Sequence, residues 1–223
     1  MKIDYVQFEQ RADRSAYIAR RFGDLLGPAL LDVGCDKALL RTLLPQVAYT
    51  GIDVGGTPDI RIDLEHIERL PFADDQFDAT VCSDVLEHLD NLHFIFGELV
   101  RVSREHIVVS LPNNWTNARR PIERGRGAIA HYGLPATPPP DRHKWFFGFS
   151  EAVDFLREQE RRYPISIVEL VANEKRRPLP ARLLRRARYP ALETYLNRYA
   201  HTVWVVYRKR APRPGGVPAS AQP

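Results

Sequence analysis

The chain has 223 residues, a formal net charge of +4 and two cysteines, with 44% hydrophobic and 27% charged residues. This composition is ordinary for a globular protein, so it excludes wholesale disorder and the composition of a membrane protein. No stretch approaches the roughly 20 apolar residues of a membrane span, and the first residues lack a secretory signal pattern. We therefore expect a cytoplasmic protein without a disulfide framework.

Apolar patterning along the chain predicts alternating helices and strands. An amphipathic helix is expected first, followed by short apolar or β-branched runs that indicate buried strands. The seven predicted strands cover residues 29–33, 47–53, 60–64, 77–83, 106–111, 165–171 and 202–207. The predicted helices cover residues 15–26, 38–44, 90–102, 150–161 with Ser150 as N-cap, and 191–199. This alternation predicts a doubly wound α/β fold, Rossmann-like, with a mostly parallel seven-stranded sheet in three α/β/α layers.

Three segments depart from this alternation. Residues 115–148 are rich in Pro, Gly, Arg and His without periodicity, so we expect an irregular lid or substrate segment at about 113–149. A basic insertion follows at about 174–200, and residues 211–223 have the composition of a disordered tail. The organisation we expect is therefore a single domain over residues 1–210.

The basic insertion contains a concentrated run of positive charge. Residues 175–188 carry seven cations and no acid. Such a run suits contact with phosphate groups or with an anionic membrane surface, which would make the protein peripheral at the membrane. A solvated basic helix face is the alternative interpretation, and contact with nucleic acid also stays open.

Polar residues follow the ends of the predicted strands, where a doubly wound sheet binds its ligand. Asp32 and Gly34 end the first strand, and Asp53 ends the second. Asp53 comes 21 residues after Asp32 (53 − 32), about where an acid accepts hydrogen bonds from the ribose of an adenine nucleoside. Asp63 and Leu64 end the third strand and could hold the adenine. The pattern predicts a site for an adenosine that carries positive charge.

Four segments together resemble the class I S-adenosylmethionine-dependent methyltransferases. They are Leu30–Cys35, Gly51–Asp53, the sequence LPFADDQFD at 70–78 and DVLEHL at 84–89. The resemblance covers residues 30–112 well and extends loosely to Tyr207, where that fold has an antiparallel C-terminal strand. It implies S-adenosyl-L-methionine as the cofactor, held by Asp32, Gly34, Cys35, Asp53, Val54, Asp63, Leu64, Ser83 and His88.

The chain also departs from the usual pattern of that family. Asp36 and Ala38 stand where the family usually has two glycines after the first strand. A Cβ and a negative charge at Asp36 would crowd and repel the methionine carboxylate, whereas pairing with the methionine ammonium is the alternative. The sequence leaves open whether these two residues weaken cofactor binding.

The irregular segment supplies the candidates for acceptor chemistry. Methyl transfer depends mainly on alignment of the nucleophile with the methyl carbon and sulfur, and a hydroxyl acceptor also benefits from a general base. His143 and His131 are the candidate catalytic bases, and Asn113, Tyr132 and Trp145 are the candidate substrate contacts. We expect the acceptor to be a hydroxyl or carboxylate of a small molecule, or of a glycan or lipid-linked intermediate. A loose resemblance to methyltransferases of surface-polysaccharide biosynthesis points the same way.

Two other functions are compatible with parts of the sequence. A catalytically weak cofactor-binding protein or a nucleic-acid-associated protein could share the fold, and a nicotinamide-dependent oxidoreductase could share the strand-end pattern. The last is disfavoured, because the turn at 34–38 lacks the glycines that admit a pyrophosphate. We expect no metal site, since no further Cys or His accompanies Cys35 and Cys82 at metal-ligand spacing. The oligomeric state is not indicated.

Overall fold

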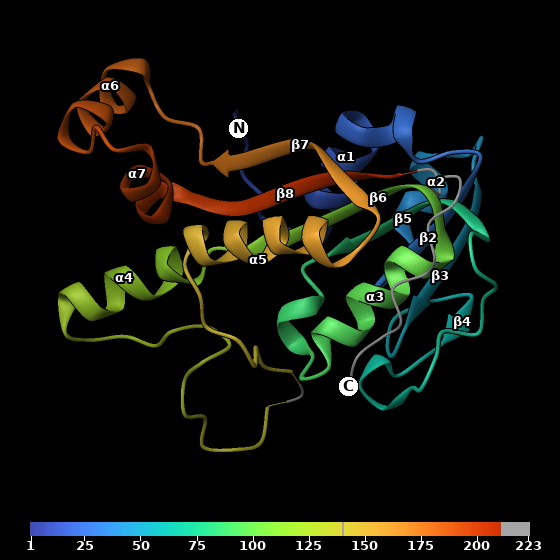
Figure 1. The fold of residues 1–223 in the computed structure, drawn as a ribbon. Helices are drawn as coiled ribbons and strands as arrows, with labels where there is room; N and C mark the ends of the chain where they lie inside the picture. The colour runs from blue at the N-terminus through green and yellow to red at the C-terminus, as the bar shows by residue number, and fades with distance from the viewer. Residues whose placement is uncertain (140, 211–223) are drawn as a thin grey trace.

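The computed structural model describes residues 1–139 and 141–210, so the predicted tail at 211–223 lies outside the described residues. Its centre is a single eight-stranded sheet in the order β1-β7-β8-β6-β5-β2-β3-β4 (Figure 1). The strands are β1 (Lys2–Tyr5), β2 (Ala29–Val33), β3 (Ala48–Asp53), β4 (Ile60–Arg61), β5 (Phe77–Ser83), β6 (Ser103–Pro112), β7 (Ile165–Glu174) and β8 (Ala200–Lys209). Only β8 runs antiparallel to its neighbours, between β6 and β7. The predicted mostly parallel sheet with an antiparallel C-terminal strand is confirmed.

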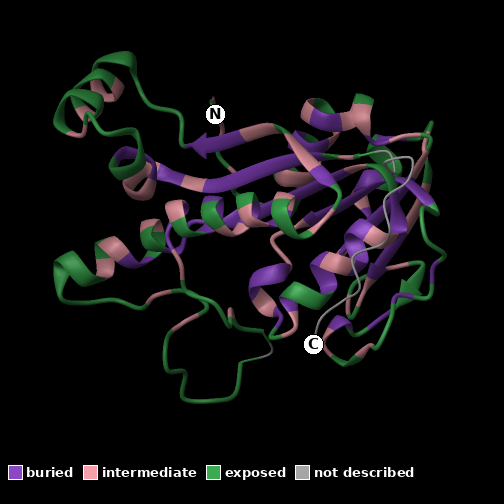
Figure 2. Cartoon of the chain, in the orientation of Figure 1, coloured by how far each residue is buried: buried purple, intermediate pink, exposed green. Residues whose placement is uncertain are grey.

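Helices cover both faces of the sheet. They are α1 (Arg11–Phe22), α2 (Leu39–Leu43), α3 (Leu92–Val102), α4 (Asn114–Arg124), α5 (Phe149–Arg162), α6 (Leu179–Arg188) and α7 (Leu192–Tyr199), with 3-10 turns at Gly23–Leu25, Leu64–His66 and Leu86–His88. Apolar residues of α1 and α2 pack on one face, and those of α3, α5 and α7 pack on the other. Figure 2 shows the resulting burial along the central strands. None of the described helices is long and apolar enough to cross a membrane.

The structure corrects the predicted elements in three places. An eighth strand, β1, adds to the sheet edge by pairing in parallel with β7; only four residues long and with no residue of it buried, it gave little periodic signal. Helix α4 occupies the start of the segment expected to be irregular, although Pro121 lies inside it. Helix α5 begins at Phe149 with Gly148 as N-cap, whereas the Ser150 side chain bonds to Asn197.

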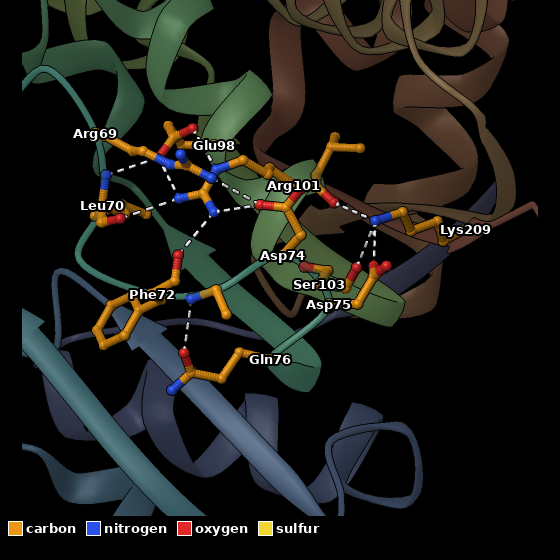
Figure 3. Close-up of polar contacts among 12 residues, drawn as sticks. Arg69, Leu70, Phe72, Asp74, Asp75, Gln76, Glu98, Arg101, Ser103 and Lys209 are labelled. Atoms are coloured by element: carbon orange, nitrogen blue, oxygen red, sulfur yellow. Dashed lines mark hydrogen bonds and ion pairs between the residues drawn. The ribbon is translucent and has the colours of Figure 1, made fainter. Parts of the chain in front are cut away.

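The LPFADDQFD segment serves as scaffold rather than as part of the pocket. Arg101 of α3 donates to the carbonyls of Leu70 and Phe72 and pairs with Glu98 at 2.7 Å and Asp74 at 2.8 Å (Figure 3). Further along, Asp78 accepts the backbone N–H of Ala29 at 2.9 Å, which anchors the start of β2. The segment therefore joins the helix layer to the two central strands whose ends carry the candidate site.

Candidate cofactor and acceptor site

The turn after β2 is tight and left-handed. Gly34 has φ +77°, and a Cβ there would lie 2.2 Å from Val85 Cγ2, so only glycine fits. Asp36 and Ala38 have φ 48° and 51°. These two residues adopt the backbone conformation that favours glycine, at the two positions where the resemblance expects glycine. Such a conformation costs an L-residue about 1–2 kcal/mol, so the turn stores strain.

Asp53 links the end of β3 to this turn. Its Oδ2 accepts the backbone N–H of Asp36 at 2.8 Å, and its Oδ1 accepts that of Gly55 at 2.9 Å. Gly56 packs directly against the Asp36 backbone with φ +61°. A Cβ at this position would lie 2.0 Å from the Asp36 carbonyl oxygen, so glycine is needed there. The carboxylate predicted to bind a ribose therefore also holds two backbone segments together.

Asp32 is the most buried carboxylate of the predicted cofactor set. It is 7% exposed, and Tyr49 donates a 2.7 Å hydrogen bond to its Oδ2. Burial raises the pKa of Asp32 to about 7, and the nearby Asp53 carboxylate adds to the rise although the Tyr49 hydrogen bond opposes it. Its charge is therefore sensitive to pH near neutrality.

A pocket of about 730 Å³ lies beyond the carboxyl ends of the strands. All nine residues predicted to bind the cofactor line it, as do both predicted catalytic histidines: Asp32, Gly34, Cys35, Asp53, Val54, Asp63, Leu64, Ser83, His88, His131 and His143. The parallel register explains this convergence, because Val33 pairs with both Ile52 and Cys82 and so brings three strand ends to one edge. Asp63 also caps the following 3-10 turn through Glu65 N–H at 3.1 Å, and it contacts His66.

The pocket has a wall that the sequence analysis missed. Phe8, Arg11 and Arg14 from the N-terminal segment line it. Arg14 pairs with Asp84 at 2.6 Å and Arg11 with Asp36 at 3.3 Å, so α1 is held across the ends of the strands. No sequence signal marked these residues, because exposed arginines on an amphipathic helix are common.

Three histidines from distant segments meet on the acceptor side of the pocket. The rings of His131 and His143 stack at 4.4 Å between centroids, and His88 meets His143 edge-on at 4.5 Å. Burial, together with the neighbouring His88 and His131, lowers the pKa of His143 to about 4. The His143 imidazole is therefore neutral over the physiological range and is a weak base there.

The three predicted substrate residues are not among those that line the pocket. Asn113 is 1% exposed, caps α4 by accepting Trp115 N–H, and donates to the carbonyl of Ala200 at 2.7 Å. The Tyr132 hydroxyl contacts His143 Nδ1 at 3.1 Å. Trp145 Nε1 donates to the carbonyl of Leu89 at 2.7 Å. The structure thus places these three side chains as supports of the loop, and direct substrate contact by Asn113 does not fit its position.

Glu87 is the other functional candidate that sequence reasoning passed over, although it lies within the DVLEHL segment. Its side chain is 1% exposed and lines the pocket. Burial, and then the nearby Asp84 carboxylate, hold the pKa of Glu87 well above its ordinary value. The available signal was its position directly before His88.

A second, basic pocket of about 380 Å³ adjoins the first and shares Asn117, Lys175 and His201 with it. Six cationic side chains line the second pocket: Arg119, Arg120, Lys175, Arg177, Arg185 and Arg198. Arg119 and Arg198 pair with Glu123, and Arg185 pairs with Glu174. Within the described part of the chain, the other three cations have no ion pair, so the pocket keeps an excess of positive charge.

Comparison with known proteins agrees with this geometry. Residues 31–108 match the family described as methyltransferase domain. The matched segment runs from β2 into β6 and contains the turn, Asp53, Asp63 and Ser83. This match to a methyltransferase domain covers about a third of the chain. S-adenosyl-L-methionine is the cofactor expected for such a domain, and the pocket is lined by the carboxylates of Asp32, Asp53 and Asp63, which can accept hydrogen bonds from it.

Relatives and solved structures agree with this methyltransferase domain. A ubiquinone biosynthesis O-methyltransferase of Klebsiella pneumoniae is 32% identical over 95 residues, which cover 34% of this chain and 38% of that protein. The chain thus aligns with well under half the length of that relative. A SAM-dependent methyltransferase from Archaeoglobus fulgidus superposes with a TM-score of 0.55 and 17% identity, covering 90% of this chain and 95% of that one.

The fold by itself does not fix the reaction. The cyclase SpnF superposes with the same TM-score of 0.55 and 16% identity, covering 90% of this chain and 82% of that one. Structural likeness at this identity shows a shared fold, and the reaction has to be argued from the site.

Proposed function

We propose that the chain transfers the methyl group of S-adenosylmethionine to a hydroxyl oxygen of a small-molecule acceptor. The observation that carries this proposal is the convergence of Asp32, Asp53, Asp63 and Ser83 at one sheet edge, next to an imidazole cluster. The similarity to an O-methyltransferase supports a hydroxyl as the acceptor group.

The proposed roles follow from position along the pocket. Asp53 accepts hydrogen bonds from the ribose hydroxyls, Asp63 and Leu64 hold the adenine, and ionised Asp32 attracts the methionine ammonium. The acceptor oxygen attacks the methyl carbon, the carbon–sulfur bond breaks with its electron pair going to sulfur, and the acceptor hydroxyl loses its proton. We propose the exposed His131 as the base, because His143 with a pKa of about 4 is a weak one.

The basic pocket indicates the chemical class of the acceptor. Because it is continuous with the cofactor pocket through Lys175 and His201, an acceptor hydroxyl beside the cofactor could extend an anionic group into it. Arginine is well suited to bind phosphate through paired hydrogen bonds. We therefore propose an acceptor that carries both a hydroxyl and a phosphate, as a lipid-linked or sugar-phosphate intermediate does.

Helix α6 supports a membrane location for such an acceptor. Its arginines turn toward the protein, with Arg182 3.4 Å from the Tyr5 ring centroid, while Leu183 and Leu184 are 60% and 72% exposed. The helix lies at the periphery, away from the sheet (Figure 1), and is largely exposed along its length (Figure 2). An exposed apolar face on a helix that also carries four arginines suits the surface of an anionic bilayer. We propose that α6 rests on such a surface.

Methyl transfer is tested with S-adenosylmethionine labelled in its methyl group. Matched acceptors, a hydroxylated sugar phosphate and the same sugar without phosphate, are incubated with the protein and analysed by mass spectrometry. We expect label on the oxygen of the phosphorylated acceptor, and a higher KM for Arg177→Ala with little change in kcat. Absence of heat with S-adenosylhomocysteine in titration calorimetry, from protein shown to be folded, would contradict the proposal.

A further inference from the structure

The carboxylate of Glu87 is the least satisfied charged group of the site. It is 1% exposed, and neither of its oxygens has a hydrogen-bond partner within residues 1–139 and 141–210. Burying an unpaired carboxylate costs several kcal/mol. The neighbouring Asp84 adds negative charge rather than relieving it, since its own partners are Arg14 at 2.6 Å and Ser110 at 2.5 Å. Glu87 is therefore ionised at low cost only when a positive partner binds beside it on the pocket side.

Two imidazoles converge on this carboxylate. One ligand atom from each of Glu87, His88 and His143 lies within 4.8 Å of the other two. His88 Nε2 is 3.9 Å from Glu87 Oε1. The 3.9 Å separation is too long for a hydrogen bond, yet it is compatible with two ligands of one ion, whose bonds to nitrogen and oxygen are about 2.0–2.2 Å.

The surroundings also fix the imidazoles in the state that binds metal. His88 Nδ1 lies 2.7 Å from Asp141 Oδ1, so Nδ1 carries the proton and Nε2 keeps its lone pair. A carboxylate behind a histidine is the usual outer partner of a metal ligand. Asp141 comes from the irregular segment, which is thereby tied to the turn after β5.

His143 is fixed in the same way by a different group. The Tyr132 hydroxyl gives its hydrogen to the Trp145 carbonyl and receives one from Asn114. It can therefore only accept from His143 Nδ1, 3.1 Å away, which leaves Nε2 of that ring unprotonated. Both imidazoles present a free Nε2.

We propose that Glu87, His88 and His143 bind one divalent transition-metal ion, of the Zn²⁺ or Mn²⁺ kind, at the acceptor side of the cofactor pocket. Two imidazoles and one carboxylate form a donor set that such ions accept, and three protein ligands leave coordination positions open. All three ligands line the cofactor pocket. The sequence expectation of no metal site rested on the local spacing of Cys and His, whereas these ligands come from segments that only the fold brings together.

The role of the ion rests on the proposed methyl transfer. An acceptor hydroxyl in an open position would lose its proton more readily, because a bound cation stabilises the alkoxide. The proton passes to His131, which stacks on His143 with centroids 4.4 Å apart and is not itself among the three ligands. The oxygen then attacks the methyl carbon as described above.

Metal binding is tested on the chelator-treated full chain by calorimetric titration with Zn²⁺, and with Mn²⁺ followed by electron paramagnetic resonance. We expect one equivalent per chain in the wild type and in His93→Gln, a histidine on α3 outside the cluster. Glu87→Gln and His143→Gln should each lose at least tenfold in affinity, with circular dichroism confirming the fold. Binding that is absent in the wild type, or equal in all four proteins, would overturn the proposal.

A separate measurement keeps this result apart from the proposed function. S-adenosylhomocysteine binding in the presence of chelator reports on the cofactor site alone. Cofactor binding without metal binding overturns the metal site and leaves methyl transfer standing. Metal binding without cofactor binding supports the metal site and overturns the proposed methyl transfer.

Discussion

The backbone N–H of Asp36 donates a 2.8 Å hydrogen bond to Asp53 Oδ2, which joins the turn after β2 to the end of β3. The carboxylate that we assign to the ribose thus also fixes the turn that faces the methionine group. We predict that Asp53→Ala weakens S-adenosylhomocysteine binding about a hundredfold or more, because ribose contacts and turn geometry are lost together. Titration calorimetry measures the affinity, with the exposed Asp154→Ala as the matched control. Affinity within threefold of wild type would contradict the assignment.

The left-handed conformation of Ala38 predicts a gain in stability on substitution. Ala38→Gly removes an unfavourable positive φ of 51° and should raise the free energy of unfolding by about 1 kcal/mol. Urea denaturation measures the change. The control is Ala187→Gly within α6, where glycine enters an ordinary helix and should lower stability. A loss of stability in Ala38→Gly would show that the turn is not strained.

The raised pKa of Asp32 predicts a pH-dependent affinity for the cofactor. With a pKa of about 7, the carboxyl is largely protonated at pH 6 and ionised at pH 8. If the ionised form holds the ammonium, binding of S-adenosylhomocysteine should tighten about tenfold between these values. Asp32→Asn should bind more weakly at pH 8 and show a flat profile. An unchanged slope in Asp32→Asn would place the titrating group elsewhere.

Ionisation of Asp32 should strengthen cofactor binding but lower the free energy of unfolding. The folded-state pKa of Asp32 is higher than its ordinary value of 3.8, so protonated Asp32 is favoured in the folded protein. Its contribution to stability is complete below pH 3.8 and is lost as pH rises through about 7. Asp32→Asn should therefore gain stability relative to wild type as pH rises from 5 to 8, measured without cofactor.

The Arg101 network predicts that losing a buried ion pair lowers the free energy of unfolding more than losing a surface pair. The Arg101 and Glu98 side chains are 17% and 9% exposed, whereas Arg69 is 63% exposed beside Asp74. Arg101→Ala leaves Glu98 without its counter-charge and should cost about 3 kcal/mol in the free energy of unfolding. Arg69→Ala should cost under about 1 kcal/mol. Equal losses would contradict the scaffold role of the segment.

The outward face of α6 predicts binding to anionic vesicles. The full chain should sediment with vesicles containing phosphatidylserine and not with pure phosphatidylcholine vesicles. Replacing Leu183 and Leu184 together by Ser should weaken binding at least about tenfold, because two apolar side chains no longer enter the interface. Ile122→Ser, an exposed residue on α4, is the control. A concentration-dependent dimer without vesicle binding, seen by ultracentrifugation, would assign the face to a second copy instead.

The sequence by itself determined the strand ends and most of the residues that line the main pocket. Strands buried on both faces read as continuous apolar runs, and parallel strands bring their carboxyl ends to one edge, so Asp32, Asp53, Asp63 and Ser83 were predictable from order alone. The LPFADDQFD segment carried the resemblance to the methyltransferases, and in the structure Arg101 of α3 binds its backbone carbonyls and Asp74.

Tertiary structure alone decided the rest of the site. The wall formed by α1, the meeting of His88 with His143, and the basic pocket between α4, α6 and α7 depend on how distant segments pack. The burial of Glu87 is also tertiary, because a carboxylate on a turn is ordinarily solvated, and here distant residues such as His143 and Lys144 lie beside it. Local spacing carries no information about such long-range contacts.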